Sequence, residues 1–471
     1  MKVLYAPIQQ PNVFQIAMLR ALVEVAEVEC VNYLAWGRGL AGRSPKRLLA
    51  TGHPVRAWRC LSSRRLSRAV LLEAVRSARP DVVHMQIQQG PVITPRLLRR
   101  IKREFPRIIL SHWTGDVRID IPRNLLACAK ICDFTFSASY SYVCRFREHG
   151  CNAYYLQHTY EPVEHFPRPG PRDIPAVYLG NYIPDGHILG VRERLGFARI
   201  VKEFGGHVYG ANWPDGLSDG AVGYFCGSGA VYARSKIVLN ANHWPEDRMY
   251  QSDRWFHAAA SGAFTLSYYH PDTDYVIEDG VHTRFFRTEK ELAELVRYYL
   301  AHDEERERIA AQGRAFCLDH HNPATRARAL MRAWTCPERG RAHWASPALG
   351  ETEAELVRTH AKGRVLDMGA CLRDTSLSED PAYTDVDGNL PGMKWRDSIL
   401  KTPFHGGIFD TVALHYADDP NWPLALAEAM RLATKKLIVF AAPGNLQVPG
   451  FAAAREGQHL VAAREARGEG R

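Results

Sequence analysis

Apolar and polar positions in the first 160 residues follow the pattern of short buried strands separated by amphipathic helices. The predicted strands are apolar runs bounded by turn residues, at 2–6, 28–34, 80–86, 107–113, 133–139 and 153–158. Uninterrupted apolar runs of this length are typical of parallel strands that helices cover on both faces. The alternation predicts a doubly wound α/β domain with Rossmann-like topology over residues 1–165.

The pattern restarts after the Pro-rich joint EPVEHFPRPGPRDIP. Residues 176–336 form the second predicted domain. Its expected strands are 176–181, 206–210, 235–240 and 263–269, with a helix at 190–204. Two Rossmann-like α/β domains are therefore predicted, and ligands of such open sheets bind at the carboxyl ends of the strands.

The stretch from Tyr232 to Tyr269 combines several signals of an anion site. The apolar strand SKIVLN leads through a polar loop to Ser252, which stands where a helix N-cap belongs. A short helix follows over 254–261. Its N-terminus offers N–H groups and a positive dipole end to a phosphate, and Arg254 can add a bidentate contact. The alternative is an ordinary αβ unit with a capped helix.

The region around this stretch resembles the C-terminal domain of group 1 glycosyltransferases, and more narrowly their CgeB/YkvP-like spore-maturation branch. The resemblance rests on YARSKIVLN, SDRWFHAAASGAF, the turn EDG at 278–280, ELVRYYLAHDEERERIAAQG and DHH at 319–321. It implies a GT-B architecture, in which two Rossmann-like domains face each other across a cleft. It also implies that the second domain holds a nucleotide-sugar donor and that transfer needs no metal.

Candidate donor-binding residues follow from this resemblance and from the strand ends. They are Gly180, Asn181, Lys236, Ser252, Asp253, Arg254, His257 and Gly262. Gly180 lets the backbone approach a phosphate, and Arg254 with Lys236 would stabilise the departing diphosphate. His257 stands where many relatives have a glutamate that binds the donor ribose. Neutral imidazole has a single accepting nitrogen, so the donor is held differently or catalysis is weakened.

The first domain offers the candidate catalytic residues. SHWTGDVR follows a strand end, where we expect His112, Thr114, Gly115 and Asp116 to be exposed to the cleft. The resemblance covers this segment as well, through its aromatic-x-Gly-Asp turn. His112 would transfer a proton to or from the acceptor, and Asp116 would bind acceptor hydroxyls. In the alternative, Asp116 caps the turn and His112 only packs.

Residues 350–447 resemble a class I S-adenosylmethionine-dependent methyltransferase. The candidate cofactor residues are Asp367 and Gly369, in GRVLDMGAC, and Asp387 at the end of a second expected strand. The second and third motif glycines are absent, and the usual final strand pair is missing. The tail 448–471 looks helical or disordered. We expect an incomplete, non-catalytic domain, with active methylation as the alternative.

Charge and composition limit the other classes. The chain carries a formal net charge of +9, and 46% of its 471 residues are hydrophobic. Arginine-rich helices explain the charge and allow peripheral contact with an anionic membrane, although solvated helix faces are the alternative. Without an RNA-binding signature, nucleic acid is not an expected partner. No apolar run spans a bilayer and no signal peptide is evident, so we predict a cytoplasmic protein.

These observations predict a metal-independent glycosyltransferase with no cofactor beyond its nucleotide-sugar substrate. The ten cysteines show no CxxC pairs, and Asp272-Thr273-Asp274 has the composition of a turn, so no metal site is predicted. The acceptor would be a surface polysaccharide, a spore-coat component or a protein. Two alternatives remain: a non-catalytic GT-B binding or assembly protein, and a bifunctional glycosyltransferase and methyltransferase.

Overall fold

The structure is a computed structural model, and its chain divides into two compact units, Met1–Thr335 and Cys336–Arg471. The described residues are 1–7, 13–33, 50, 54–87, 92–118, 120–183, 191–214, 216–222, 227–242, 244, 246–335, 351–361, 363–368, 393–395, 404–415, 422–440, 442, 444 and 446–465.

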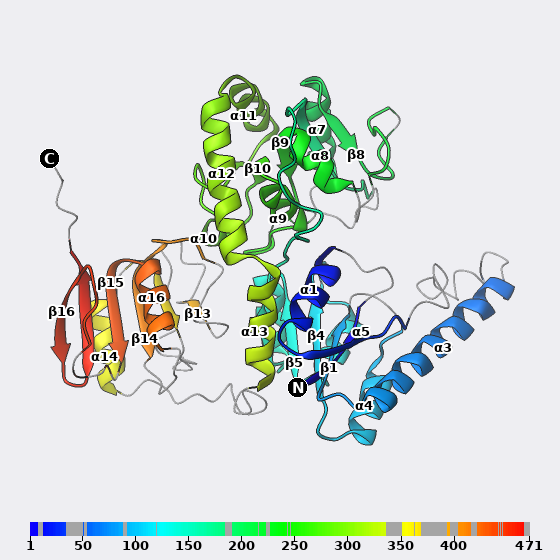
Figure 1. Cartoon of the computed structure of the whole chain (residues 1–471), viewed down its shortest axis with the longest axis horizontal. Helices are drawn as coiled ribbons and strands as arrows, with labels where there is room; N and C mark the ends of the chain where they lie inside the picture. Colours follow the sequence, from blue (N-terminus) through cyan, green and yellow to red (C-terminus); the bar gives the residue numbers. More distant parts are fainter. Residues whose placement is uncertain are drawn as a thin grey trace. The chain divides into compact units, whose positions relative to one another are not determined.

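The first sheet of unit 1 (Met1–Thr335) has six parallel strands in the order β2-β1-β3-β4-β5-β6 (Figure 1). The strands are β1 (Lys2–Ala6), β2 (Glu27–Cys30), β3 (Val82–Gln86), β4 (Ile109–Thr114), β5 (Phe134–Ser137) and β6 (Ala153–Tyr155). Strands β3 and β5 are buried along their whole length, which explains their uninterrupted apolar character. The predicted parallel sheet is confirmed.

Helices that begin after turn or capping residues connect these strands. They are α1 (Val13–Val23), α3 (Pro54–Ala78), α4 (Pro95–Glu104), α5 (Arg123–Ala129) and α6 (Tyr140–Glu148). Thr94 accepts the Leu97 N–H at the start of α4, and Ser139 does the same for Tyr142 in α6. These caps fix where each helix leaves the carboxyl end of its strand.

The second sheet of unit 1 is also parallel, in the order β11-β10-β9-β7-β8. Its strands are β7 (Ile174–Leu179), β8 (His207–Tyr209), β9 (Ser235–Asn240), β10 (Phe264–Tyr268) and β11 (Arg284–Phe286). Its helices are α7 (Val191–Glu203), α8 (Ser228–Arg234), α9 (Asp253–Ala260), α10 (Thr273–Val276), α11 (Glu289–Ala301) and α12 (Asp303–His320). The Rossmann-like second domain is confirmed.

The last helix of unit 1, α13 (Pro323–Thr335), returns to the first domain. Leu330 and Trp334 belong to the same apolar core as Val3 and Met18, so α13 packs against α1 and the first sheet. The sequence places these residues at the end of the second domain, but their apolar face is buried in the first. The crossing ties the two domains together at a point remote in sequence from the Pro-rich joint.

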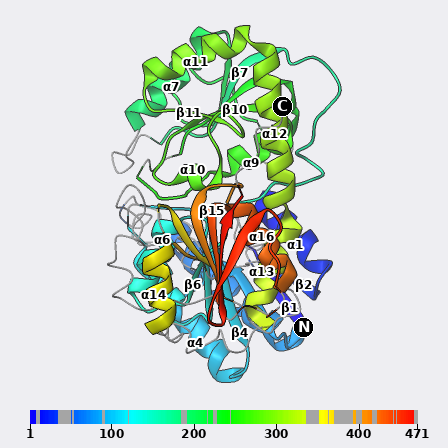
Figure 2. The same cartoon turned by 90° about the vertical axis from the view of Figure 1, so that its left-hand side faces the viewer.

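Unit 2 (Cys336–Arg471) contains a six-stranded sheet in the order β13-β12-β14-β15-β17-β16. Figure 2 shows α14 and α16 on either side of it. Its elements are α14 (Glu351–His360), β12 (Val365–Met368), β13 (Met393–Trp395), β14 (Phe409–His415), α16 (Trp422–Leu432), β15 (Ala433–Phe440), β16 (Phe451–Glu456) and β17 (His459–Arg464). Strand β17 is antiparallel to both of its neighbours, whereas β12 to β15 pair in parallel.

Two predictions for this unit are wrong. The final strand pair is present, and the segment predicted to be a helical or disordered tail forms the hairpin of β16 and β17. Gly457, with φ +63°, allows its tight turn. Alanine-rich sequence favours helix, but His459 to Ala462 are buried between β15 and β16, and this burial outweighs the local propensity. The strand expected to end at Asp387 lies outside the described residues.

No helix among the described residues is long and apolar enough to cross a membrane.

Candidate active site

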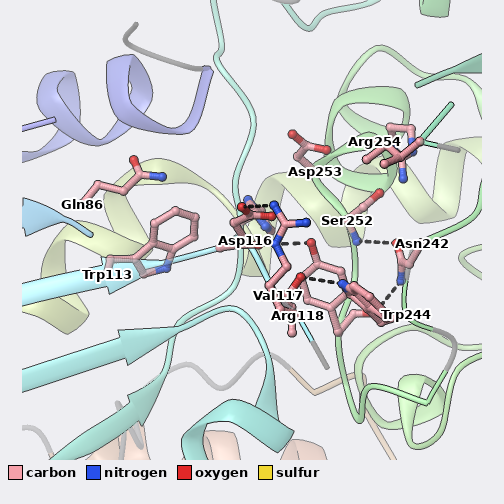
Figure 3. Close-up of a pocket in the computed structure, with 14 residues that line it drawn as sticks. Gln86, Trp113, Asp116, Val117, Arg118, Asn242, Trp244, Ser252, Asp253 and Arg254 are labelled. Carbon is pink, nitrogen blue, oxygen red and sulfur yellow. Dashed lines mark hydrogen bonds and ion pairs between the residues drawn. The ribbon is translucent and has the colours of Figure 1, made fainter. Parts of the chain in front are cut away.

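A cavity of about 230 Å³ lies in unit 1 where the carboxyl ends of the two sheets meet (Figure 3). Its lining comes from the segments that follow β3, β4, β6, β7 and β9, and from the start of α9. The lining residues are Gln86, Trp113, Gly115, Asp116, Val117, Arg118, His158, Ile183, Asn242, Trp244, Tyr250, Ser252, Asp253 and Arg254. This is the edge at which open α/β sheets bind ligands, and the cavity lies where the sequence predicts the site.

The start of α9 forms one wall of the cavity. Ser252 has the extended backbone of an N-cap, as predicted, but its hydroxyl donates to Asn240 Oδ1 at 2.8 Å instead of capping the helix. The Ser252 N–H donates to Asn242 Oδ1 at 3.1 Å. These contacts fix the first turn against β9. Asp253 and Arg254, the next two residues, line the cavity.

Two buried arginines lie beside Gly180 at the end of β7. Arg254 Nη2 donates to the Ala241 carbonyl at 2.8 Å, and Arg194 Nε donates to the Tyr178 hydroxyl at 2.6 Å. Arg254 Nε and Arg194 Nη2 are buried without a hydrogen-bond partner, and neither arginine forms an ion pair within the described part of the chain. Burial lowers the pKa of Arg194, and the charge of Arg254 lowers it further. Arg194 and Arg254 are therefore two neighbouring cations without an anionic partner among the described residues.

Gly180 makes room for this pair. A Cβ at position 180 would lie 3.0 Å from Arg194 Nη2 and 3.5 Å from Arg254 Nη1. Two of the candidate donor-binding residues, Gly180 and Arg254, therefore lie close together. Arg194 was not predicted, because it lies within α7 and reads as one of several arginines of an amphipathic helix. Its position in the first turns of the helix that follows the Gly180 loop is the signal that could have found it.

The opposite wall is the loop after β4. Asp116 pairs with Arg118 at 3.0 Å, and Figure 3 shows this pair at the cavity. Burial raises the pKa of Asp116, while the Arg118 charge opposes that rise. A Cβ on Gly115 would lie 2.2 Å from the Trp113 ring and 2.5 Å from the His158 ring, so only glycine fits here. The position of Asp116 at the cavity is as predicted.

A segment of the second domain reaches across to this wall. The Trp244 indole N–H donates to the Val117 carbonyl at 2.5 Å, and the Tyr250 hydroxyl donates to the Gly115 carbonyl at 3.1 Å. Between them, Asp247 accepts from the Ser139 hydroxyl at 2.9 Å, and burial raises the pKa of Asp247 to about 6. The segment 244–250, hereafter the bridging segment, joins the two walls of the cavity. Its residues were not predicted.

The prediction that His112 faces the cleft is wrong. Its side chain is fully buried and lies edge-on to Phe146, with ring centroids 6.1 Å apart. Burial lowers the pKa of His112 to about 3, so the ring is neutral at pH 7. Both faces of β4 are covered, so alternation along the strand does not separate cavity from core. Thr114, expected beside it, is also fully buried.

His257 also lies away from the cavity. It is buried one helical turn after Asp253 and stacks on His165, with ring centroids 4.1 Å apart and planes within 6°. Burial lowers the pKa of His257 to about 3. The predicted contact with a donor hydroxyl does not fit this position, because the ring fills the space between α9 and the segment that contains His165.

Three further donor residues lie outside the cavity lining. Lys236 is at the amino end of β9, near Asp303, whose pKa is lowered mainly by Arg306 and only slightly by the charge of Lys236. Gly262, with φ +77°, follows the far end of α9, about 13 Å from the helix start at a rise of roughly 1.5 Å per residue. Asn181 accepts the Ala211 N–H at 2.8 Å and holds the loop after β8. Lys236 and Gly262 are therefore too far from the cavity for the predicted donor contacts. The Asn181 side chain holds the loop after β8 instead of lining the cavity.

The cofactor residues predicted for unit 2 cannot be assembled into a site. Asp367 lies on β12, and Gly369 and Asp387 lie outside the described residues. In the described part of the chain, no group of three His, Cys, Asp or Glu side chains is placed to hold a metal ion. Asp272 forms an ion pair with Arg248, and Asp274 accepts from the Tyr269 hydroxyl at 3.2 Å. The predicted turn ends at Asp272, because Thr273 and Asp274 form the first turn of α10.

The second domain of unit 1 is similar to a known family. Residues 192–332 match the family model described as glycosyl transferase-like. The match covers Arg194, the bridging segment and α9, which are the elements that form the second-domain side of the cavity. The prediction of a glycosyltransferase is confirmed at the level of this family match. No curated protein matches the chain.

Solved structures show weaker overall similarity. HepE of Anabaena, solved with UDP and glucose, is 12% identical, with 71% of this chain and 99% of HepE covered and a TM-score of 0.48. Sucrose-phosphate synthase of Thermosynechococcus elongatus is 10% identical, with 71% and 98% covered and a TM-score of 0.49. TarM is 9% identical, with 57% and 58% covered and a TM-score of 0.43.

The geometry defines what the cavity can do chemically. The second-domain wall offers the buried guanidinium of Arg254, with Arg194 beside it at Gly180, to an anion that carries more than one charge. The first-domain wall offers Asp116, a carboxylate whose pKa burial raises. The bridging segment holds both walls in one arrangement.

Proposed function

We propose that the chain transfers a sugar from a nucleotide-sugar to an acceptor, with the second domain of unit 1 binding the donor. The observation that carries the proposal is the pair Arg194 and Arg254, which are buried beside Gly180 without an ion-pair partner among the described residues, with Arg254 at the cavity. An isolated buried charge is strongly unfavourable, so two adjacent buried cations point to an anionic ligand that completes the site. A diphosphate matches their number and geometry.

The same two arginines would act on the departing nucleoside diphosphate. As the bond between the sugar and the diphosphate breaks, negative charge grows on the leaving oxygen. Guanidinium groups already fixed by Ala241 and Tyr178 stabilise that charge without reorganising. This role needs no metal ion, and metal independence is part of the proposal. The nucleotide-sugar is the substrate, and no cofactor beyond it is proposed.

Asp116 is our candidate for the residue that accepts the acceptor's proton. It faces the same cavity from the opposite domain, and burial raises its pKa. A base of raised pKa takes a proton more readily near neutral pH. Gln86 and Asn242 add hydrogen-bonding groups to the lining, which suits an acceptor with hydroxyl groups. A glycan is therefore the acceptor class that we favour over a protein.

The narrower assignments belong to the same proposal. The CgeB/YkvP-like affiliation rests on the sequence segments around α9, and a cytoplasmic location is proposed with it. A membrane surface is a further proposed partner, through the basic helices of the first domain. The non-catalytic alternative rests on His257, which occupies the position of the expected glutamate and is buried against His165.

Unit 2 supports a second, separate proposal. Its sheet ends in a strand inserted antiparallel between two others, β17 between β15 and β16. This order matches the class I methyltransferase topology that the sequence resembles, and we propose a methyltransferase-like domain without catalytic activity. S-adenosylmethionine added to the whole chain should leave its melting temperature unchanged. A concentration-dependent rise would instead favour the bifunctional alternative.

The test of transfer is a pair of assays on the whole chain. In a thermal-shift screen of UDP-, GDP-, ADP- and dTDP-sugars, one ligand at 100 times its dissociation constant should add about 2.7 kcal/mol of stability. The same sugar-nucleotide should then be hydrolysed or transferred by wild-type protein, and more slowly by Asp116→Asn. Binding without turnover would favour the non-catalytic alternative. No shift with any nucleotide would contradict the proposed function.

A further inference from the structure

The first half of helix α3 exposes large apolar side chains to solvent. Val55, Trp58 and Leu61 are 61%, 68% and 52% exposed, and Leu66 is 45% exposed. Figure 1 shows the first turns of this helix extending past the first sheet. A single exposed leucine is ordinary, but four large apolar residues within twelve positions form a patch that calls for an explanation.

The second half of the same helix is conventional. Leu71 and Val75 are fully buried, and Arg76 pairs with Glu104 of α4 at 2.9 Å. The C-terminal turns of α3 are therefore packed against the first domain, whereas its N-terminal turns project and expose apolar side chains to solvent.

The charge of the projecting half has one sign. Arg56, Arg59 and Arg65 are exposed, Arg64 and Arg68 are partly exposed, and no Asp or Glu occurs between Pro54 and Leu72. The formal charge of this stretch is therefore positive throughout, in a chain whose net charge is +9. Helical surface exposed to water normally mixes both signs, as α12 does with its acidic first turn.

Apolar and basic side chains share one face of the helix. Trp58, Leu61 and Arg65 follow the spacing i, i+3 and i+7, which places them on one stripe. Arg59 and Leu66, seven residues apart, flank it. In a membrane interface, the indole and aliphatic groups of such a stripe can enter the headgroup region while the long arginine side chains reach up to the lipid phosphates.

We propose that the projecting half of α3, residues 54–66, docks unit 1 onto an anionic lipid surface. Exposed Trp58 and Leu61 supply the apolar contact, and Arg56, Arg59 and Arg65 the attraction to lipid phosphates. A nucleic acid would use the arginines and leave Val55, Trp58 and Leu61 without a partner. The inference does not depend on the donor site, because its observations lie on a different element.

The expected strength follows from the residues involved. Each arginine near an anionic membrane contributes about a fivefold gain in partitioning, equivalent to about 1 kcal/mol. Arg56→Gln, Arg59→Gln and Arg65→Gln together should weaken partitioning on the order of a hundredfold. Trp58→Ser should weaken it at least about tenfold, because the indole no longer leaves water.

The experiment is vesicle co-sedimentation of the whole chain. Wild-type protein should sediment with vesicles of phosphatidylcholine mixed with phosphatidylglycerol, remain free with phosphatidylcholine alone, and be released by high salt. Matched controls carry the same changes elsewhere in unit 1. They are Arg199→Gln, Arg297→Gln and Arg308→Gln combined, and Val163→Ser, whose side chain is 60% exposed. Both should bind as wild type does.

Three outcomes would overturn the proposal. One is no sedimentation with anionic vesicles at low salt. Another is an equal loss of binding in the control variants, which would indicate only the net charge of the chain. The third is a Trp58-dependent dimer in sedimentation velocity without lipid, which would assign the face to a second copy. Melting temperatures of all variants, expected to match wild type, keep loss of folding separate from loss of binding.

Discussion

The two walls of the cavity differ in how their charges are balanced. On the second-domain wall, Arg254 lines the cavity and Arg194 lies next to it at Gly180, and neither forms an ion pair among the described residues, although the Asp253 carboxylate lines the same wall. On the first-domain wall, Asp116 has its own counter-ion, Arg118, at 3.0 Å. The fold therefore leaves unpaired guanidinium groups, an electrostatic deficit, on the second-domain side. The deficit predicts where an anionic ligand binds, and the balanced wall is suited to a neutral partner such as a glycan.

The largest expected effect comes from removing the unbalanced charges. A hydrogen bond to a charged group contributes about 1.5–3 kcal/mol, so Arg254→Ala or Arg194→Ala should weaken nucleotide binding about tenfold to a hundredfold. The double variant should weaken it about a thousandfold or more. Displacement of a fluorescent nucleotide would measure this. Arg199→Ala, an exposed arginine on the same helix as Arg194, should bind normally. Equal losses in all three single variants would contradict the comparison.

A substitution on the first-domain wall should lower turnover and leave nucleotide binding unchanged. Asp116→Asn removes the proposed base and should lower kcat by about a hundredfold or more, with the nucleotide dissociation constant unchanged. Steady-state kinetics and nucleotide displacement measured together separate the two. Asp120→Asn, an exposed acid four residues away, is the control. A loss of nucleotide affinity in Asp116→Asn would assign this wall to the donor and contradict its proposed role.

The contribution of the bridging segment to the stability of the protein should depend on pH. Burial raises the pKa of Asp247 to about 6 from its usual 3.8, so the folded state binds this proton more tightly than the unfolded state. The resulting stabilisation is complete below pH 3.8 and is lost as pH rises through 6. Between pH 4 and pH 7, wild type should lose about 2.4 kcal/mol of unfolding free energy relative to Asp247→Asn. Urea unfolding at several pH values measures this difference, and parallel curves would contradict it.

The smallest expected effect is a gain in stability. Replacing one of the two buried cations with an apolar residue of similar length removes an uncompensated charge. Arg194→Met should raise the unfolding free energy of the ligand-free protein by about 1 kcal/mol while it abolishes most nucleotide binding. Chemical denaturation without nucleotide provides the measurement. A destabilised Arg194→Met would show that the hydrogen bond to Tyr178 outweighs the charge, and would weaken the account of this wall.

The architecture of unit 1 could be predicted from the sequence because its strands are buried on both faces and therefore appear as uninterrupted apolar runs. The sequence was also sufficient for Ser252, Asp253 and Arg254, since a short helix that begins after a buried strand and a polar loop has a local signature. His112 was misplaced for the same physical reason that made β4 easy to find: a strand covered on both sides gives no alternation. Which face of β4 meets the cavity depends on the second domain.

Other residues could not be found from local pattern. Arg194 acquires its role only because β7, α7 and α9 converge, and the contacts of Trp244 and Tyr250 with the first domain join positions more than a hundred residues apart. In unit 2, the alanine-rich segment from Phe451 to Arg464 forms strands because β15 offers an edge for pairing. Propensity describes the isolated segment, whereas the neighbouring strand decides its structure.

The central claim is that Arg194 and Arg254 form a diphosphate site, and calorimetric titration tests it most directly. Wild type and the Arg194→Ala, Arg254→Ala double variant would each be titrated with the diphosphate and the monophosphate of the nucleoside that the thermal-shift screen selects. We predict that wild type binds the diphosphate at least about tenfold more tightly and that the double variant loses this preference. Equal affinities of wild type for the two nucleotides, or an unchanged preference in the double variant, would contradict the claim.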